Sequence, residues 1–356
     1  MTVTGPAPAR SPVATAPGEV LLAARHLVQE FPVRDRSGLR SAVVHAVSDV
    51  SFEVRAGETL GIVGETGSGK STLARALFQA PRPKSGEVLL AGQDLVRLRG
   101  KALLGARRHL QMVFQDPFGS LDPRWRVSDL VEEPLACYRV GSKGERRRRV
   151  AEVLELVGLD PGVFGGRKPR QLSGGQAQRV AIARALALEP ALVVCDEAVS
   201  SLDVLVQAQV LNLFEDLRER LGLSYLFIAH DLSLVKQVSD RVAVLYLGRL
   251  CEVGPAAAVY GRPAHPYTEG LLASIPPPDP DAGRSRTVVG VQGEPPSPID
   301  PPSGCRFRTR CPRAEARCAA EPPELAAVDG DPDHQVACHF PLPAVPPPST
   351  PVPSGP

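Results

Sequence analysis

The chain is poor in aromatic residues, in long apolar runs and in excess charge of either sign. Aromatic residues make up 4% of its 356 residues. No window offers the roughly 18 to 20 uninterrupted apolar residues needed to span a bilayer, and residues 1–20 lack the charged-then-apolar order of a secretory signal. The chain is therefore expected to stay in the cytoplasm, where it can dock on a membrane protein.

Charge is nearly balanced, with 41 basic residues against 39 acidic ones and a net charge of +2. Proteins that bind nucleic acid generally carry a basic excess, so this balance argues weakly against that class. A basic run at residues 143–149 has two interpretations, an RNA contact or the solvated start of a helix, and the second is favoured because an apolar helical pattern follows directly.

Composition divides the chain into four parts. Residues 1–19, rich in Pro, Ala and Thr, are expected to be disordered. Residues 20–272 alternate strand-like and helix-like runs, which predicts an α/β domain with a mostly parallel sheet covered on both faces, and residues from about 117 to 185 predict a helical subdomain within it. Residues 273–342 start as a proline-rich linker and continue into a cysteine-bearing extension, and residues 343–356 form a proline-rich tail.

The sequence GETGSGKS follows a predicted strand and opens a predicted helix, which is the context that makes this pattern specific for phosphate binding. Its glycines let successive backbone N–H groups point at phosphates, Lys70 reaches the β and γ oxygens, and the Ser71 hydroxyl can bind magnesium. The alternative is a glycine-rich turn with an incidental Lys-Ser pair. The residues expected to contact ATP here are Gly64, Glu65, Thr66, Gly67, Ser68, Gly69, Lys70, Ser71 and Thr72.

Polar side chains follow three other apolar runs. Asp196 and Glu197 end the run ALVVCDE, and strand ends in open α/β sheets hold ligands. Asp196 is expected to hold magnesium and Glu197 to deprotonate the attacking water, although an acidic loop after a core strand is the simpler alternative. His230 follows the run SYLFIAH and is a candidate for the γ-phosphate, while a lone His is more often structural. Gln115 follows MVF and offers an amide to magnesium or water.

The order of these motifs, together with LSGGQ at residues 172–176 and SLD at residues 201–203, resembles the ATPase subunit of an ABC transporter. The resemblance implies a P-loop NTPase fold with a mixed-sheet core, a helical subdomain and a small Cys-rich C-terminal extension. In this family LSGGQ faces the ATP held by a second subunit, so it implies an action in trans for Ser173, Gly174, Gly175 and Gln176, with Asp203 coupling the two sites. Phe31 is the candidate for stacking on adenine.

Five segments resemble the oligopeptide/dipeptide importer branch more narrowly: residues 114–127, 196–214, 245–254, 265–276 and 301–312. This resemblance implies an ATP-hydrolysing subunit at the cytoplasmic face of the plasma membrane, using ATP and Mg²⁺. Its partners would be a second ATPase subunit, identical or paralogous, two membrane permeases and, indirectly, an extracytoplasmic solute-binding protein. The surface around Gln115 would receive a permease helix. The transported solute stays open.

Four of the seven cysteines fall in the extension, spaced C-x5-C-x6-C-x19-C, without the close C-x2-C pairs of common zinc modules. A reducing compartment makes disulfides an unlikely use of these residues. The resemblance favours a structural [4Fe–4S] cluster, with zinc and free thiols as the alternatives. The residues are Cys305, Cys311, Cys318 and Cys338.

A competing function is that of a soluble ABC ATPase acting on nucleic acid or ribosomes. Such proteins carry long insertions between the phosphate loop and the signature, or two cassettes in one chain, and this sequence has neither. A regulatory partner with a degenerate site is disfavoured because Lys70, Glu197 and His230 are all present.

Overall fold

The computed structural model describes residues 16–34, 41–275 and 290–343. Most of the segment expected to be disordered at the N-terminus and most of the proline-rich tail lie outside these residues, as does the first part of the linker. In the part of the chain that is described, no helix combines the length and the apolar character that a membrane span requires.

The main sheet has eight strands in the order β11-β12-β10-β9-β3-β8-β7-β6. The five from β9 to β6 run parallel, whereas β10, β12 and β11 are antiparallel to their neighbours. This is the expected mixed sheet. The strands are β3 (Thr59–Val63), β6 (Leu110–Val113), β7 (Leu192–Asp196), β8 (Ser224–Ile228), β9 (Arg241–Tyr246), β10 (Arg249–Pro255), β11 (Ala326–Val328) and β12 (Asp331–Val336).

The central strands β3, β7 and β8 are buried along their whole length. Parallel strands covered by helices on both faces are continuous apolar runs rather than alternating ones, which is why the sequence predicted these three. Because parallel strands end at the same edge, the segments that follow β3, β8, β7 and β6 lie next to one another in the order in which the strands lie.

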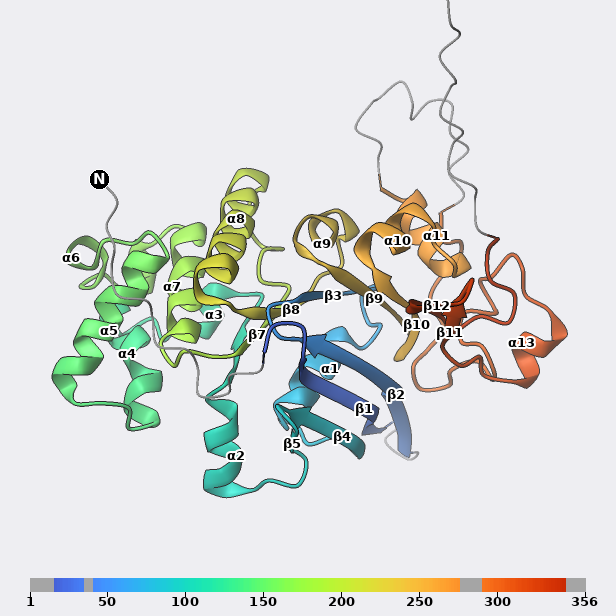
Figure 1. Ribbon diagram of the computed structural model, residues 1–356, viewed down its shortest axis with the longest axis horizontal. Coiled ribbons are helices and arrows are strands. Elements are labelled where there is room, and N and C mark those ends of the chain that lie inside the picture. The colour runs from blue at the N-terminus through green and yellow to red at the C-terminus, as the bar shows by residue number, and fades with distance from the viewer. Residues whose placement is uncertain (1–15, 35–40, 276–289, 344–356) are drawn as a thin grey trace, which may run out of the picture.

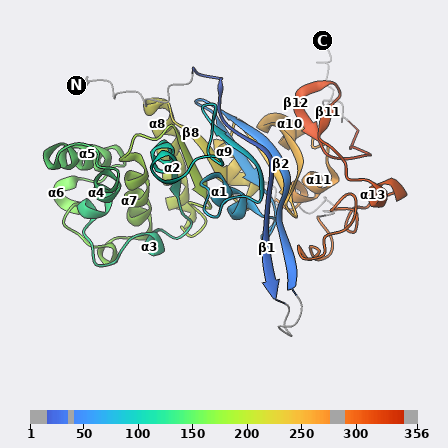
Figure 2. The same cartoon turned by 90° about the horizontal axis from the view of Figure 1, so that it is seen from below.

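A second, antiparallel sheet has the order β2-β1-β4-β5. Its long strands β1 and β2 extend well beyond the rest of the molecule in Figure 2. Helix α1 (Lys70–Leu77) lies between the two sheets and buries Leu73 and Leu77 against apolar residues of both. The strands are β1 (Val20–Arg34), β2 (Ser41–Arg55), β4 (Ser85–Leu90) and β5 (Gln93–Asp94).

A group of helices forms the green layer at one end of the molecule in Figure 1. Within it, α5 starts at a capping box in which Ser142 and Glu145 exchange side-chain and backbone hydrogen bonds, so the basic run is a helix start. The helices are α3 (Pro117–Ser120), α4 (Val127–Cys137), α5 (Lys143–Leu156), α6 (Pro161–Phe164) and α7 (Gly174–Leu186), with a 3₁₀ turn over Pro169–Gln171.

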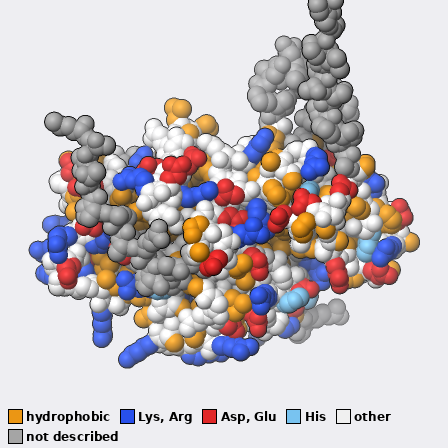
Figure 3. Space-filling view, viewed as in Figure 1, with side chains coloured by type: hydrophobic (Ala, Val, Ile, Leu, Met, Phe, Trp, Pro, Cys, Tyr) orange, Lys and Arg blue, Asp and Glu red, His pale blue; other side chains and the backbone are white. Residues whose placement is uncertain are grey.

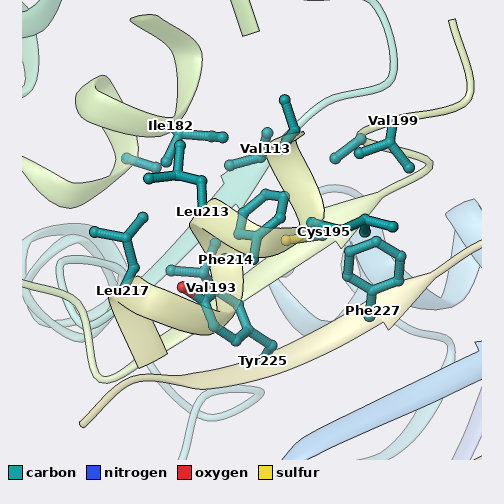
Figure 4. Close-up of a cluster of buried hydrophobic side chains, with 14 of the residues drawn as sticks. Val113, Ile182, Val193, Cys195, Val199, Leu213, Phe214, Leu217, Tyr225 and Phe227 are labelled. Carbon is teal, nitrogen blue, oxygen red and sulfur yellow. The ribbon is translucent and has the colours of Figure 1, made fainter. Parts of the chain in front are cut away.

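Helix α8 (Val204–Leu221) covers one face of the main sheet. Its Phe214 packs edge-on against Tyr225 and Phe227 of β8, with ring centroids 5.4 and 6.0 Å apart. Figure 4 shows this cluster, in which side chains from α7, α8, β7 and β8 meet. The helix starts at Asp203, whose carboxylate accepts the Val206 N–H at 3.0 Å, and ends at the left-handed Gly222.

The C-terminal extension joins the main sheet, because β12 pairs with β10. The pairing buries Glu252, which accepts hydrogen bonds from the backbone N–H groups of Ala264 and His265 and contacts His334 Nε2 at 2.7 Å. On the face shown in Figure 3, basic and acidic side chains are interspersed, in keeping with the balanced charge. The remaining helices are α2 (Gly100–Arg107), α9 (Leu232–Val238), α10 (Ala256–Gly261), α11 (Pro266–Ala273) and α13 (Ala316–Ala320).

Candidate active site

The phosphate loop joins β3 to α1 and depends on two glycines for its path. Gly64 has φ +155°, and a Cβ atom there would lie 2.1 Å from the Leu245 carbonyl oxygen. Gly69 has φ +105°, and its Cβ would lie 2.1 Å from the Ala46 carbonyl oxygen. No other residue fits these positions, so the loop keeps a backbone cradle at the N-terminus of a helix, where anions bind.

Lys70 lies inside this cradle, with 5% of its surface exposed. Its ammonium donates to the carbonyl oxygens of Gly64 and Glu65, at 2.7 and 3.0 Å. Burial lowers the pKa of Lys70, and the carboxylates of Glu197, Asp196 and Glu65 oppose that shift. A phosphate group would supply the negative charge that this buried cation lacks.

Two of the three magnesium ligands predicted from the sequence, Ser71 and Asp196, are adjacent. The Ser71 hydroxyl donates to Asp196 Oδ1 at 2.9 Å, which brings the start of α1 to the end of β7. Burial raises the pKa of Asp196, and the hydrogen bond from Ser71 opposes it. The structure brings together two oxygen ligands of the kind that Mg²⁺ prefers.

Glu197 and His230 meet beside this pair, because they follow the neighbouring strands β7 and β8. His230 Nδ1 lies 3.6 Å from Glu197 Oε2, and the two side chains are 52% and 18% exposed. Glu197 has a positive φ of 51° and donates its backbone N–H to the Ile228 carbonyl oxygen at 2.9 Å. This left-handed backbone conformation is strained for a residue with a side chain, and such strain is typical of functional sites.

Gln115 follows β6, at the far side of the same sheet edge, and its side chain is exposed. Its carbonyl oxygen accepts a hydrogen bond from the Ser201 hydroxyl at 3.1 Å. The backbone at Gln115 is therefore hydrogen-bonded to the SLD segment that precedes α8. A groove of about 290 Å³ lies alongside, between β6 and the helices α4 and α7, and Phe114, Arg107 and Glu133 are among its lining residues.

The signature LSGGQ opens α7, as the sequence predicted. Ser173 and Gln176 form a capping box: the Ser173 hydroxyl accepts the Gln176 N–H, and Gln176 Oε1 accepts the Ser173 N–H at 3.0 Å. A Cβ atom at Gly175 would lie 2.6 Å from Val206 Cγ1, so only glycine lets α7 approach the start of α8 this closely. Within the described part of the chain, no hydrogen bond or ion pair joins the signature to the phosphate loop.

The comparisons with known proteins agree with this arrangement. The ABC transporter family matches residues 47–200, and the family described as "Oligopeptide/dipeptide transporter, C-terminal region" matches residues 251–318. The chain is 46% identical to the oligopeptide transport ATP-binding protein AppF of Bacillus subtilis, over 90% of its own length and 98% of the relative's. The chain belongs to the ABC transporter ATP-binding proteins.

Two further comparisons support this family. A "Probable peptide ABC transporter ATP-binding protein" of Sinorhizobium fredii is 48% identical over 92% of this chain and 91% of its own. Among solved structures, a dimeric ATP-binding cassette in a post-hydrolysis state bound to ADP and phosphate matches with a TM-score of 0.59 and 29% identity, covering 66% of this chain and 98% of the other. The chain is thus an ABC-type ATPase, for which ATP and Mg²⁺ are the expected cofactors.

The site of this ABC ATPase fits those cofactors on two observations besides the glycine cradle. Ser71 and Asp196 present adjacent oxygens at the end of the loop. The Ser68 hydroxyl is buried and has no hydrogen-bond partner among the described residues, which leaves a polar group free to meet a ligand. Phe31 is half-buried on β1, opposite Val44 of β2, and its role at adenine stays a prediction.

The four cysteines of the extension line one cavity, together with His265 and Phe307. The cavity measures about 10 Å³, roughly the room for one water molecule. In the described ranges, no three His, Cys, Asp or Glu residues form a group that could hold a metal ion. The structure therefore does not support the expected iron–sulfur cluster. Burial raises the pKa of Cys305 and Cys311, and that of Cys338 to about 11, which favours neutral thiols.

Two contacts to the phosphate loop were missing from the sequence prediction. The Tyr267 hydroxyl accepts the Glu65 N–H at 2.9 Å, and the Arg310 guanidinium pairs with the Glu65 carboxylate. The only signal in the sequence was the arginine-rich stretch between Cys305 and Cys311, which had no assigned role.

Proposed function

We propose that this ABC ATPase is the subunit that energises a peptide importer, working at the cytoplasmic face of the plasma membrane with a second ATPase subunit and two permeases. What supports it most is the match of the C-terminal region to the oligopeptide/dipeptide transporter family, beside an ATPase core that matches the ABC transporter family. An extracytoplasmic solute-binding protein would deliver di- or oligopeptides. Closure of the two ATPase subunits around ATP would shift the permeases between states, and hydrolysis would reset them.

The residues at the sheet edge have separate roles in this proposal. The backbone of residues 64–69, with Lys70 and Thr72, binds the phosphates, and Ser71, Asp196 and Gln115 hold Mg²⁺, which neutralises charge on the phosphates. Glu197 takes the proton of the attacking water, and His230 contacts the γ-phosphate.

The signature acts in trans in this proposal. Ser173, Gly174, Gly175 and Gln176 would bind the γ-phosphate of the nucleotide on the partner subunit, with the positive end of the α7 dipole aimed at it. Asp203 would couple the two sites. The capping box supports this role, because it fixes the first turn of α7 before any partner arrives.

The groove beside Gln115 is the proposed docking site for a short permease helix. Apolar side chains are exposed at and near it, with Phe114 at 45% and Phe118 at 44%. The groove lies between β6 and the helical subdomain, so a helix seated there would sense movement of one against the other.

Reconstitution with the permeases and the solute-binding protein tests the function. We expect ATP hydrolysis that depends on the permeases, rises with peptide-loaded binding protein, and falls when Phe114 is replaced by Asp. Activity indifferent to permeases and stimulated by nucleic acid would instead support the soluble ABC ATPase.

The iron–sulfur cluster is a separate proposal, supported by the convergence of all four cysteines on one cavity and weakened by the lack of a metal-binding group there. Anaerobically purified protein decides it. About four irons per chain with visible absorption would support the cluster. One zinc per chain would support a zinc site, and no metal would support free thiols.

A further inference from the structure

Arg310, in the extension, forms a bidentate ion pair with Glu65 of the phosphate loop. Arg310 donates from Nη1 to Glu65 Oε2 at 2.6 Å and from Nη2 to Glu65 Oε1 at 2.9 Å. Its side chain is 5% exposed and that of Glu65 is 26% exposed. A bidentate arginine–carboxylate pair fixes both the distance between the two side chains and their orientation, and this pair is largely shielded from water.

The surroundings of Arg310 make this contact rigid. Its Nε donates to the Gln292 carbonyl oxygen at 2.9 Å, and its guanidinium lies 5.8 Å from the centre of the Tyr246 ring. Phe307, on the same segment, packs against Tyr246 and Tyr267, with centroids 5.3 Å from each ring. Tyr267 lies in the ATPase domain and accepts the Glu65 N–H, so the extension contacts the Glu65 side chain through Arg310 and supports its backbone only indirectly, where Phe307 packs on Tyr267.

The same segment supports the loop from a second side. Arg306 donates to the Leu247 carbonyl oxygen and to the Ser48 hydroxyl, in the turn between β9 and β10 and on β2. The next residue of that turn, Gly248, donates its N–H to the Ser68 carbonyl oxygen at 2.7 Å. Arg310 therefore contacts the loop at Glu65, and Arg306 contacts the turn that is hydrogen-bonded to the loop at Ser68.

Charge gives Arg310 a second effect. The Glu65 carboxylate is close enough to Lys70 to oppose the lowering of its pKa. Without Arg310, an uncompensated carboxylate would repel the phosphates of a nucleotide and would compete with them for Lys70. With Arg310 in place, the charge of Glu65 is neutralised and the orientation of its carboxylate is fixed.

The geometry points to Arg310 as a positioning residue for ATP: by holding and neutralising Glu65, it keeps the phosphate loop ready for the nucleotide and makes ATP affinity depend on the C-terminal extension. This inference rests on ATP binding at the phosphate loop. Arg310 does not touch the reacting atoms, so its effect falls on nucleotide affinity rather than on the chemical step.

A charge-removal cycle on the full-length chain tests it, with MgATP as the probe in equilibrium binding. We expect Arg310→Gln to weaken binding about tenfold, within the roughly 5- to 150-fold range of coupling between sites. We expect the double variant Arg310→Gln, Glu65→Gln to return to within about twofold of the unmodified protein, because the free carboxylate is gone. In the assembled transporter, Arg310→Gln should raise KM for ATP and leave kcat unchanged.

Arg317→Gln is the matched control, because Arg317 is an exposed arginine of the same extension whose ion-pair partner, among the residues that the structure describes, is the exposed Glu321. It should bind MgATP like the unmodified chain. An MgATP affinity that is unchanged in Arg310→Gln overturns the inference. The inference is also overturned if Arg310→Gln binds MgATP more weakly, the added Glu65→Gln does not restore binding, and the loss accompanies a fall in Tm.

Should Arg310→Gln not fold, Arg310→Lys takes its place, since it keeps the charge but loses the two-pronged contact. We expect weaker MgATP binding in this variant at an unchanged Tm, and normal affinity would overturn the inference. If the unmodified chain itself does not bind MgATP, the ATPase assignment fails instead.

Discussion

Glu197 has a positive φ that residues with a side chain rarely adopt. Its carboxylate lies beside His230 and near the buried Lys70, a position that suits the general-base role proposed above. We expect Glu197→Gln to lower the rate of ATP hydrolysis by roughly 100- to 10,000-fold, the usual contribution of a general base. Binding of MgATP should be retained, because the substitution keeps the shape of the side chain.

Phosphate release and equilibrium MgATP binding, measured on the same preparations, check this prediction. Glu152→Gln serves as the control, since that glutamate is exposed on α5, and it should hydrolyse ATP at the normal rate. Hydrolysis that persists in Glu197→Gln would move the base to another residue.

His265 is a buried histidine whose pKa is lowered by folding. Burial lowers its pKa to about 4, and the nearby Glu252 opposes this only in part. Between about pH 6.5 and pH 4 the unfolded chain therefore binds a proton that the folded chain does not. The free energy of unfolding should fall as the pH drops through this window, by on the order of 2 to 3 kcal/mol for this group at pH 4.5.

Denaturant unfolding at pH 7 and pH 4.5 measures that loss. In His265→Asn it should be smaller by the same amount, since Asn does not titrate yet offers an oxygen to the Tyr267 N–H that His265 Nδ1 now accepts. Equal losses in the unmodified protein and in His265→Asn would show that His265 titrates normally.

Helix α8 carries both a buried and an exposed large apolar side chain, so the effect of packing can be compared within one helix. Phe214, 3% exposed, fills the space between the helix and β8, whereas Leu205 at the start of the helix is 78% exposed. We expect Phe214→Ala to lower the free energy of unfolding by about 3 to 5 kcal/mol. Leu205→Ala should change it by less than about 0.5 kcal/mol. Urea unfolding compares the two, and similar values would mean that α8 does not pack as described.

The elements that the sequence predicted carry their own signals. The phosphate loop has its glycines, α7 and α8 have caps, and β7 and β8 are unbroken apolar runs. Strand β12 has no such signal, because DPDHQV neither alternates nor contains an apolar run, and it is a strand through its pairing with β10 and β11.

Part of the site could not be predicted for the same reason. The strand-end positions follow from a general rule of parallel sheets, so the sequence could place Asp196, Glu197 and His230 at one sheet edge, while their roles stay predictions. Arg310 and Glu65 lie 245 residues apart, and an arginine between two cysteines has the same local pattern whether it is exposed or buried. Only the folded chain shows which of its neighbours it meets.

At the scale of the whole molecule, the extension is a structural part of the ATPase core. A chain that ends at Ala273 would lose β12, which leaves the edge of β10 unpaired and removes His334 from the buried Glu252. Unpaired strand edges promote aggregation, and a buried polar group that loses its hydrogen-bond partner costs about 1 to 3 kcal/mol. We expect this truncated chain to aggregate during purification.

Size-exclusion chromatography and thermal unfolding, compared with the full chain, check this expectation. A monodisperse truncated protein with an unchanged Tm would show that the core does not need β12.

The position of this support in the chain has a consequence for protein synthesis. A ribosome adds roughly 5 to 20 residues per second, starting at the N-terminus. Because Arg310 follows Glu65 by 245 residues, a nascent chain would carry its phosphate loop for roughly 12 to 50 seconds before the arginine that holds it has been made. Strand β12 is made later still, after every residue assigned to the nucleotide site.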